Sequence, residues 1–352
     1  MAGLSRPRRM WWGAVPLLLA AGLLSGCTSG RFAGGATTLA PGGSEPPTSI
    51  VPTTVPGTTE SGRLAFLGSV ERLPVMPVAK GQTGTLVPSP GTGEYRDVVQ
   101  VAYRQLGSGK PLVLIPGQDA SMTWWSPAVL QTLAQHYAVT VFDLPGVGYS
   151  GPPSSRPSVQ SFADVTAGLI GELGLKAPVV LGWGMGGQVA LALAERHAGL
   201  ASDLVLLDTG IAGAQSLQAA PSVRAVLDSP SSTLSELAAL AFPGSEGPAR
   251  QAWLGELRAQ IPDTVTSSAV SMEAALEQSA WSSRSLGSGT GSLDLPVLVM
   301  GGSSDPVFPA VDTVALASMI PGAQHYLWRG TGYAGFAQDP TQFATLVEDF
   351  TS

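Results

Sequence analysis

The stretch LGWGMGG, residues 181–187, predicts a sharp turn between a buried strand and a helix. The apolar residues before it predict a strand that ends at Gly182, and the alanine- and leucine-rich stretch after it predicts a helix over 185–198. Glycine permits backbone conformations that other residues avoid, which suits so tight a turn. At its centre stands Gly184, which has no side chain.

The same order of strand, turn and helix continues on both sides of this turn. Strands that alternate with helices indicate a mostly parallel, twisted sheet with helices on both faces, which is an α/β fold. The sequence predicts strands at 98–104, 111–116, 139–143, 178–182, 204–208, 296–300 and 324–328, and helices at 126–136, 160–173, 185–198, 310–319 and 340–350.

A long segment, about 211–292, separates two of the predicted core strands. Helical patterns at 234–241, 248–260 and 266–281 indicate that it is mostly α-helical. It is either a cap over a site at the sheet edge or a helical excursion without a gating role.

Five segments, in this order, resemble the α/β-hydrolase superfamily: LVLIPGQDASMTW from 112, FDLPGVGYS from 142, LGWGMGG from 181, VLVMGGSSD from 297 and GTGYAGFAQD from 330. The resemblance covers roughly residues 95–350. It implies an α/β-hydrolase domain over 93–352, in which the segment 211–292 is a helical cap insertion.

The resemblance also implies where catalytic groups should stand, and two are missing. The serine of the family's G-x-S-x-G turn is replaced by Gly184, and the histidine of its G-x-G-H loop is replaced by Tyr333. The acid position, Asp305, is retained. A tyrosine, with an ordinary pKa near 10, is a poor general base at neutral pH. Treated as two independent losses, these changes predict a catalytically impaired protein.

The other acids and bases of the chain do not restore this set. The chain has three histidines, His136, His197 and His325, and none stands in the loop that should carry the base. Asp208 stands at the end of another predicted strand and is a second candidate acid, although capping of a turn is the better interpretation. Asp305 itself is expected to hydrogen-bond Tyr333 or to cap the turn that follows it.

The oxyanion-binding backbone is the part that side-chain changes affect least. The resemblance implies that the backbone N–H groups of Gln118 and Met185 are the donors. Trp183 lies beside them in sequence, and Trp124 and Trp125 follow the same loop. These tryptophans either line a pocket or pack in the core.

The N-terminus has the parts of an export signal. Arg6, Arg8 and Arg9 precede an uncharged apolar run, and LSGC, ending at Cys27, resembles a bacterial lipobox whose cysteine is lipidated. The resemblance implies a palmitate-type anchor at Cys27 and a protein held on the extracytoplasmic face of the cell membrane. A short transmembrane anchor, or a signal with a chance cysteine, is the alternative.

Two further segments precede the predicted domain. Residues 28–60 are rich in Gly, Pro, Ser and Thr and predict a disordered spacer. Residues 61–92 mix apolar residues with prolines and predict an N-terminal arm or strand. Loss of residues 1–26 would change the formal net charge from −7 to −10, because that segment holds three arginines. This acidity argues against a nucleic-acid partner.

Three functions are compatible with the sequence. The first is a pseudoenzyme that binds a small apolar or acyl ligand, or a protein partner that the sequence does not identify. The second is an active hydrolase, esterase or lyase with an unusual constellation, in which Ser121, Thr209, Ser303 or Ser304 is the nucleophile or Tyr333 is a proton donor. The third is a structural role in the envelope. No metal-binding or nucleotide-binding motif is present, so no cofactor is predicted.

Overall fold

The computed structural model describes residues 71–72, 76–78, 97–99, 101–260 except 119, 152, 154–156, 211–216 and 245–246, and residues 290–352. Several predictions therefore lie outside the described residues: the export signal with Cys27, the spacer 28–60, most of the arm 61–92 and the helix at 266–281.

The core of the described chain is an eight-stranded sheet with the order β1-β4-β6-β5-β7-β8-β9-β10. All neighbours from β6 to β10 are parallel, whereas β4 runs antiparallel to β6 and β1 antiparallel to β4. The predicted, mostly parallel sheet is thus confirmed. The strands are β1 Glu71–Arg72, β4 Ala102–Gly107, β5 Lys110–Ile115, β6 Tyr137–Phe142, β7 Val179–Trp183, β8 Asp203–Leu207, β9 Val297–Gly302 and β10 Gln324–Trp328.

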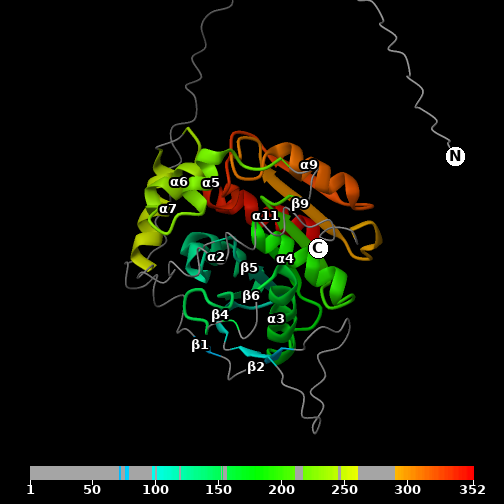
Figure 1. Cartoon of the computed structure of the whole chain (residues 1–352). Helices are drawn as coiled ribbons and strands as arrows, with labels where there is room; N and C mark the ends of the chain where they lie inside the picture. Colours follow the sequence, from blue (N-terminus) through cyan, green and yellow to red (C-terminus); the bar gives the residue numbers. More distant parts are fainter. Residues whose placement is uncertain are drawn as a thin grey trace, which may run out of the picture. The chain divides into compact units, whose positions relative to one another are not determined.

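Helices cover both faces of this sheet (Figure 1). Alternate residues of a strand point to opposite faces, so Leu112 and Leu114 of β5 join one buried cluster, while Val113 and Ile115 join the other. On the face of Val113, the strands pack against α3 Val159–Glu172, α4 Met185–Arg196 and α9 Ala310–Met319. On the face of Leu112, they pack against α2 Pro127–Leu133, α10 Gly335–Gln338 and α11 Pro340–Thr351.

The cap insertion between β8 and β9 adds three described helices, α5 Pro221–Leu227, α6 Leu234–Ala241 and α7 Pro248–Gln260. They lie together in Figure 1, apart from α3 and α4. Their buried side chains, among them Ala238, Trp253 and Leu257, belong to the cluster that also holds Leu112. The cap therefore covers the same face as α2. Within the described part of the chain, every helix is too short or too polar to span a bilayer.

The structure differs from the sequence-based predictions in two places. The single strand predicted at 98–104 is divided: β3, Asp97–Val99, pairs with β2, Met76–Val78, in a separate two-stranded sheet, and β4 starts at Ala102. The division arises because the two parts pair with different partners. The helices α5 and α10 were not predicted, since so few residues carry no readable 3.6-residue period.

Candidate active site

The turn around Gly184 has the sharp geometry that the sequence predicts. Gly184 joins the end of β7 to the start of α4 with φ 57° and ψ −120°. Its N–H donates to the carbonyl of Leu207 at 2.9 Å, and its own carbonyl accepts from the N–H of Gly187 at 2.9 Å. A positive φ strongly favours glycine, so a side chain here would be held under strain.

The neighbouring glycines are required by close backbone approach. A Cβ on Gly182 would collide with the carbonyl oxygen of Gly186, and a Cβ on Gly186 would collide with that of Ile115. A Cβ on Gly187 would lie 2.6 Å from Cγ2 of Thr209. These contacts bring α4 against β5, β7 and β8, so the turn keeps its backbone although its centre has no reactive atom.

The hydroxyl of Tyr333 occupies the space that a side chain at position 184 would fill. A Cβ on Gly184 would collide with Oη of Tyr333 and would lie 2.9 Å from its Cζ and 3.2 Å from its Cε2. The two changed positions are therefore in contact in space. With Tyr333 in this place, a side chain at position 184 would require the phenol to shift.

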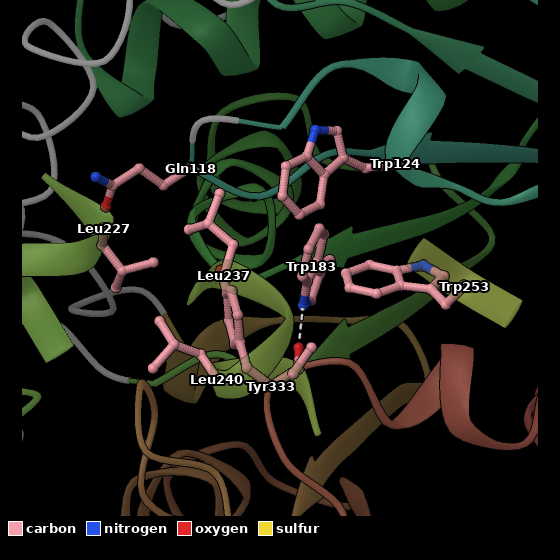
Figure 2. Close-up of a pocket in the computed structure, with 9 residues that line it drawn as sticks. Gln118, Trp124, Trp183, Leu227, Leu237, Leu240, Trp253 and Tyr333 are labelled. Atoms are coloured by element: carbon pink, nitrogen blue, oxygen red, sulfur yellow. Dashed lines mark hydrogen bonds between the residues drawn. The ribbon is translucent and has the colours of Figure 1, made fainter. Parts of the chain in front are cut away.

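Tyr333 is held by three parts of the molecule. Its ring centroid lies 4.8 Å from that of Trp183 and 5.9 Å from that of Phe308. The indole Nε1 of Trp183 donates to the carbonyl of Tyr333 at 2.7 Å, as Figure 2 shows. The backbone N–H of Tyr333 donates to the carbonyl of Leu240 in α6 at 3.2 Å. Only 6% of the residue is exposed.

The predicted oxyanion donors lie on the two backbone segments beside this hydroxyl. A Cβ on Gly117, the residue before Gln118, would lie 3.0 Å from Oη of Tyr333. Met185 is the first residue of α4, so its N–H has no acceptor within the helix. The side chain of Gln118 is used elsewhere: its Nε2 donates to Oδ1 of Asp228, at the end of α5, at 3.2 Å.

Asp305 is buried and only half hydrogen-bonded. Its Oδ1 accepts from the N–H groups of Val307 at 2.7 Å and Phe308 at 3.1 Å, while its Oδ2 has no hydrogen-bond partner among the described residues. Of the two predicted roles, the structure shows turn capping. Burial, reinforced by the nearby carboxyl of Asp208, raises the pKa of Asp305 well above its usual range.

Asp208 connects the end of β8 to the loop that carries Tyr333. It is fully buried; its Oδ1 accepts from the N–H of Gly302 at 3.0 Å, while its Oδ2 has no hydrogen-bond partner among the described residues. Burial raises the pKa of Asp208 to about 8. The backbone N–H of Gly335, two residues after Tyr333, acts on the same carboxyl and opposes the rise of its pKa. The sequence offered Asp208 as a second candidate acid or, preferably, as a turn cap, and nothing in it indicated the approach of Gly335.

The three histidines lie away from Tyr333, as predicted. His136 contacts Glu348 of α11 at 3.2 Å. His197 contacts Asp164 of α3 at 2.8 Å. His325, on β10, lies 3.4 Å from Thr313 of α9, and partial burial lowers its pKa.

The four hydroxyls proposed as substitute nucleophiles have no base in the described structure. Ser121 hydrogen-bonds Thr123 at 2.6 Å, and Ser303 accepts from the N–H of Gly330 at 2.8 Å. Thr209 is buried without a hydrogen-bond partner, and Ser304 is exposed. Among the described residues, none of the four contacts a histidine, which is the base in the family pattern.

A narrow pocket between the turn and the cap opens onto Tyr333 (Figure 2). It has room for about one water molecule. Its lining is mostly aromatic and aliphatic and consists of Gln118, Trp124, Trp183, Leu227, Leu237, Leu240, Ala241, Trp253 and Tyr333.

Of the tryptophans considered from sequence, Trp124 and Trp183 line this pocket. Trp125 lies in the core, with its ring centroid 4.9 Å from that of Phe336. Sequence reasoning missed Trp253 and the leucines, because they come from the cap helices. The described residues include no group of three or more His, Cys, Asp or Glu side chains that could hold a metal ion.

Comparisons with known proteins agree with this fold. The sequence profile of the alpha/beta hydrolase fold family matches residues 110–340. A pimeloyl-[acyl-carrier protein] methyl ester esterase of Aromatoleum aromaticum is 29% identical over 255 residues, which cover 68% of this chain and 96% of the esterase. An uncharacterized protein of Mycobacterium tuberculosis is 25% identical over 283 residues, covering 74% of this chain and 82% of its own. The crystal structure of an esterase from Rhodococcus sp. superposes with a TM-score of 0.61 at 26% identity, covering 72% of this chain and 94% of that esterase.

Proposed function

We propose that this chain, which belongs to the α/β-hydrolase fold family, is a non-hydrolytic member that holds a small apolar or acyl ligand beside Tyr333. One observation carries the proposal: the Tyr333 hydroxyl fills the space of the missing side chain at Gly184. The similar proteins include esterases, which supports an acyl compound as the ligand.

The size of the loss supports a non-hydrolytic role. In a serine protease, removal of the nucleophile or the base lowers turnover by about 10⁶-fold, which corresponds to about 8 kcal/mol of activation free energy. Here neither the Gly184 position nor the Tyr333 position carries the residue of the family pattern, and the three histidines have partners elsewhere. Backbone donors and binding alone leave only a small fraction of that rate enhancement.

The pocket supports a small apolar ligand rather than a protein partner. The cap side chains point into the pocket beside Trp183 and Tyr333 and enclose a site, instead of forming a patch on the surface. They are Leu227, Leu237, Leu240 and Trp253. None of the lining side chains carries a formal charge, so a charged ligand would lose its hydration without compensation. We infer that ligand entry requires the cap helices to move outward, because the closed pocket is so small.

The test is hydrolysis of short and medium p-nitrophenyl esters, together with labelling by a fluorophosphonate. We expect no sustained turnover and no serine label. Steady turnover that depends on Ser121, Thr209, Ser303 or Ser304 would overturn the proposal in favour of the alternative, an active hydrolase or lyase with an unusual constellation.

Ligand binding is tested separately by tryptophan fluorescence, because Trp124, Trp183 and Trp253 line the pocket. Neutral acyl and aromatic compounds should change the emission of the wild type. Leu240→Phe, which fills the pocket, should weaken the response at least tenfold, whereas the matched variant Leu217→Phe, at a 55% exposed position, should leave it unchanged. Equal responses from both variants would mean that the ligand binds elsewhere.

We also propose that the chain is exported and anchored to the outer face of the membrane through Cys27. The basic start, the apolar run and LSGC support this proposal. Cys27→Ser should abolish incorporation of labelled palmitate and release the protein from the membrane fraction. A variant that still fractionates with the membrane would show that another segment holds it there.

A further inference from the structure

We propose that Tyr333 is an acyl-accepting residue, whose phenolic oxygen captures a small acyl group from an activated neutral ester. This inference rests on the proposed function, since it assumes that the pocket admits an acyl ligand. In sequence, Tyr333 stands where the family pattern has its histidine base. In space, its hydroxyl lies where the family pattern has its nucleophile.

The location of the hydroxyl is the first argument. A side chain at position 184 would begin where the phenolic oxygen already lies. The oxygen at the centre of the turn is therefore supplied by the opposite loop instead of by the turn itself. In the serine hydrolase arrangement, this is the place from which the attacking oxygen reaches the carbonyl carbon.

The surroundings of the hydroxyl are the second argument. The Gly117–Gln118 backbone lies beside it, and Met185 opens α4 with an N–H that has no acceptor within the helix. Backbone donors placed in this way stabilise the negative oxygen that develops during acyl transfer. The same groups would stabilise the tetrahedral intermediate formed by attack from Tyr333.

The pocket is the third argument, because it brings an acyl group to this oxygen. Tyr333 itself is part of the lining, next to the aromatic faces of Trp124 and Trp183. The small volume and the uncharged lining favour a short neutral acyl group such as acetyl, with the leaving group directed toward the cap.

The reaction balances without a further reactant. A bond forms between Oη of Tyr333 and the acyl carbon, and the ester C–O bond breaks. The phenolic proton leaves with the departing alkoxide or phenoxide, and nothing is oxidised or reduced. Because His136, His197 and His325 have their partners elsewhere, no imidazole activates water to remove the acyl group. The acyl-tyrosine therefore accumulates, and the reaction is stoichiometric.

The experiment is the reaction of the full-length protein with p-nitrophenyl acetate. We expect a burst of about one equivalent of p-nitrophenol, a mass gain of one acetyl group and an adduct that peptide mapping places on Tyr333. Tyr333→Phe keeps the ring that packs on Trp183 and removes the oxygen, so the burst should fall at least tenfold. The matched variant Tyr326→Phe, which changes a half-buried tyrosine on β10, should react like the wild type.

The outcomes separate this inference from the proposed function. A Tyr333 adduct without sustained turnover supports both. Sustained turnover together with a Tyr333 adduct supports the inference and overturns the non-hydrolytic role. Wild-type protein without an adduct on Tyr333, or with acetyl groups spread equally over surface lysines and tyrosines, overturns the inference, and this result does not depend on whether any variant folds.

Discussion

The turn at 182–187 and the loop at 330–338 meet at one point, and they have changed in opposite ways. The turn keeps the glycines that its backbone requires but has no side chain at its centre. The loop keeps its place above the turn but carries the larger side chain of Tyr333. The comparison shows that the space left by one region is filled by the other, so the packing is preserved although neither position carries the residue of the family pattern.

Two buried carboxyl groups, those of Asp143 and Asp305, differ in how many of their oxygens are hydrogen-bonded. Asp143 uses both oxygens, accepting from the N–H of Met122 at 2.7 Å and from that of Tyr149 at 2.8 Å. Burial raises the pKa of Asp143 to about 6. Asp305 uses one oxygen and leaves the other buried without a partner in the described structure. Both carboxyl oxygens of Asp143 thus accept backbone hydrogen bonds, whereas Oδ2 of Asp305 remains an acceptor of the kind that a catalytic histidine would need.

The largest effect is expected when both residues of the family pattern are restored together, with Gly184→Ser in the turn and Tyr333→His in the loop. The histidine removes the phenol that blocks a serine, and the unused Oδ2 of Asp305 can accept its N–H. We expect p-nitrophenyl ester hydrolysis to rise by about 10³-fold or more, below the roughly 10⁶-fold of a complete site.

Adding Asp305→Asn to this double variant is the control, and it should remove most of the gain, because the imidazole is no longer oriented. A folded double variant that is no faster than the wild type would show that the site has changed beyond these two positions.

The next largest effect concerns Asp208 and the pH dependence that it gives to the free energy of unfolding. The folded-state pKa of Asp208, about 8, lies above the usual value near 3.9, so the folded protein binds this proton more tightly than the unfolded chain. The corresponding stability is complete below pH 4 and is lost as the pH rises toward 8, by up to about 1.4 kcal/mol per pH unit.

Asp208→Asn should reduce the pH slope of the urea-unfolding free energy over this range, because the amide does not titrate while its oxygen can still accept from Gly302. The raised pKa of Asp305 leaves part of the slope in place. Asp164 provides the opposite case: burial raises its pKa, but bonds from His197 and Arg196 outweigh this and lower it. Asp164→Asn should therefore lower stability at neutral pH, and this difference from the wild type should disappear as the pH falls below 4 and the carboxyl of the wild type becomes protonated. If Asp208→Asn keeps the slope of the wild type, the carboxyl is ionised in the folded state.

A smaller effect is expected when a side chain returns to the turn alone. Gly184→Ala combines a positive φ with a collision against Tyr333 and should cost about 2–5 kcal/mol. Gly199→Ala has a positive φ of 78° and open space, and should cost about 1–2 kcal/mol. Thermal and urea unfolding measure both. Equal costs would mean that Tyr333 moves aside freely.

The smallest effect concerns the hydrogen bond that joins the two regions. Trp183→Phe leaves the buried carbonyl of Tyr333 without its donor and should cost about 1–3 kcal/mol. Trp328→Phe removes a similar bond, to Gln342, outside the site. Hydrogen exchange within 330–338 should increase in the first variant more than in the second. The reverse result would show that the loop is held mainly from α11.

Much of the fold could be predicted because it depends on local patterns. The strands β5 to β10 and the helices α3, α4, α9 and α11 follow from apolar runs and from a 3.6-residue period that short windows contain. The end of β3 at Val99, the pairing of β2 with β3 and the short helix α5 could not be predicted in this way. They depend on which distant segment each piece pairs with or packs against.

The sequence by itself determined the order of the elements, the glycine turn and the absence of the serine and histidine at Gly184 and Tyr333. Only the tertiary structure decided that these two positions are one spatial feature, in which the phenol fills the space above the glycine. It also decided that the carboxyl of Asp208 lies near the backbone N–H of Gly335 and that Trp253 lines the pocket. The physical reason is that atoms exclude one another in space, and contacts between residues about 150 positions apart leave no pattern along the chain.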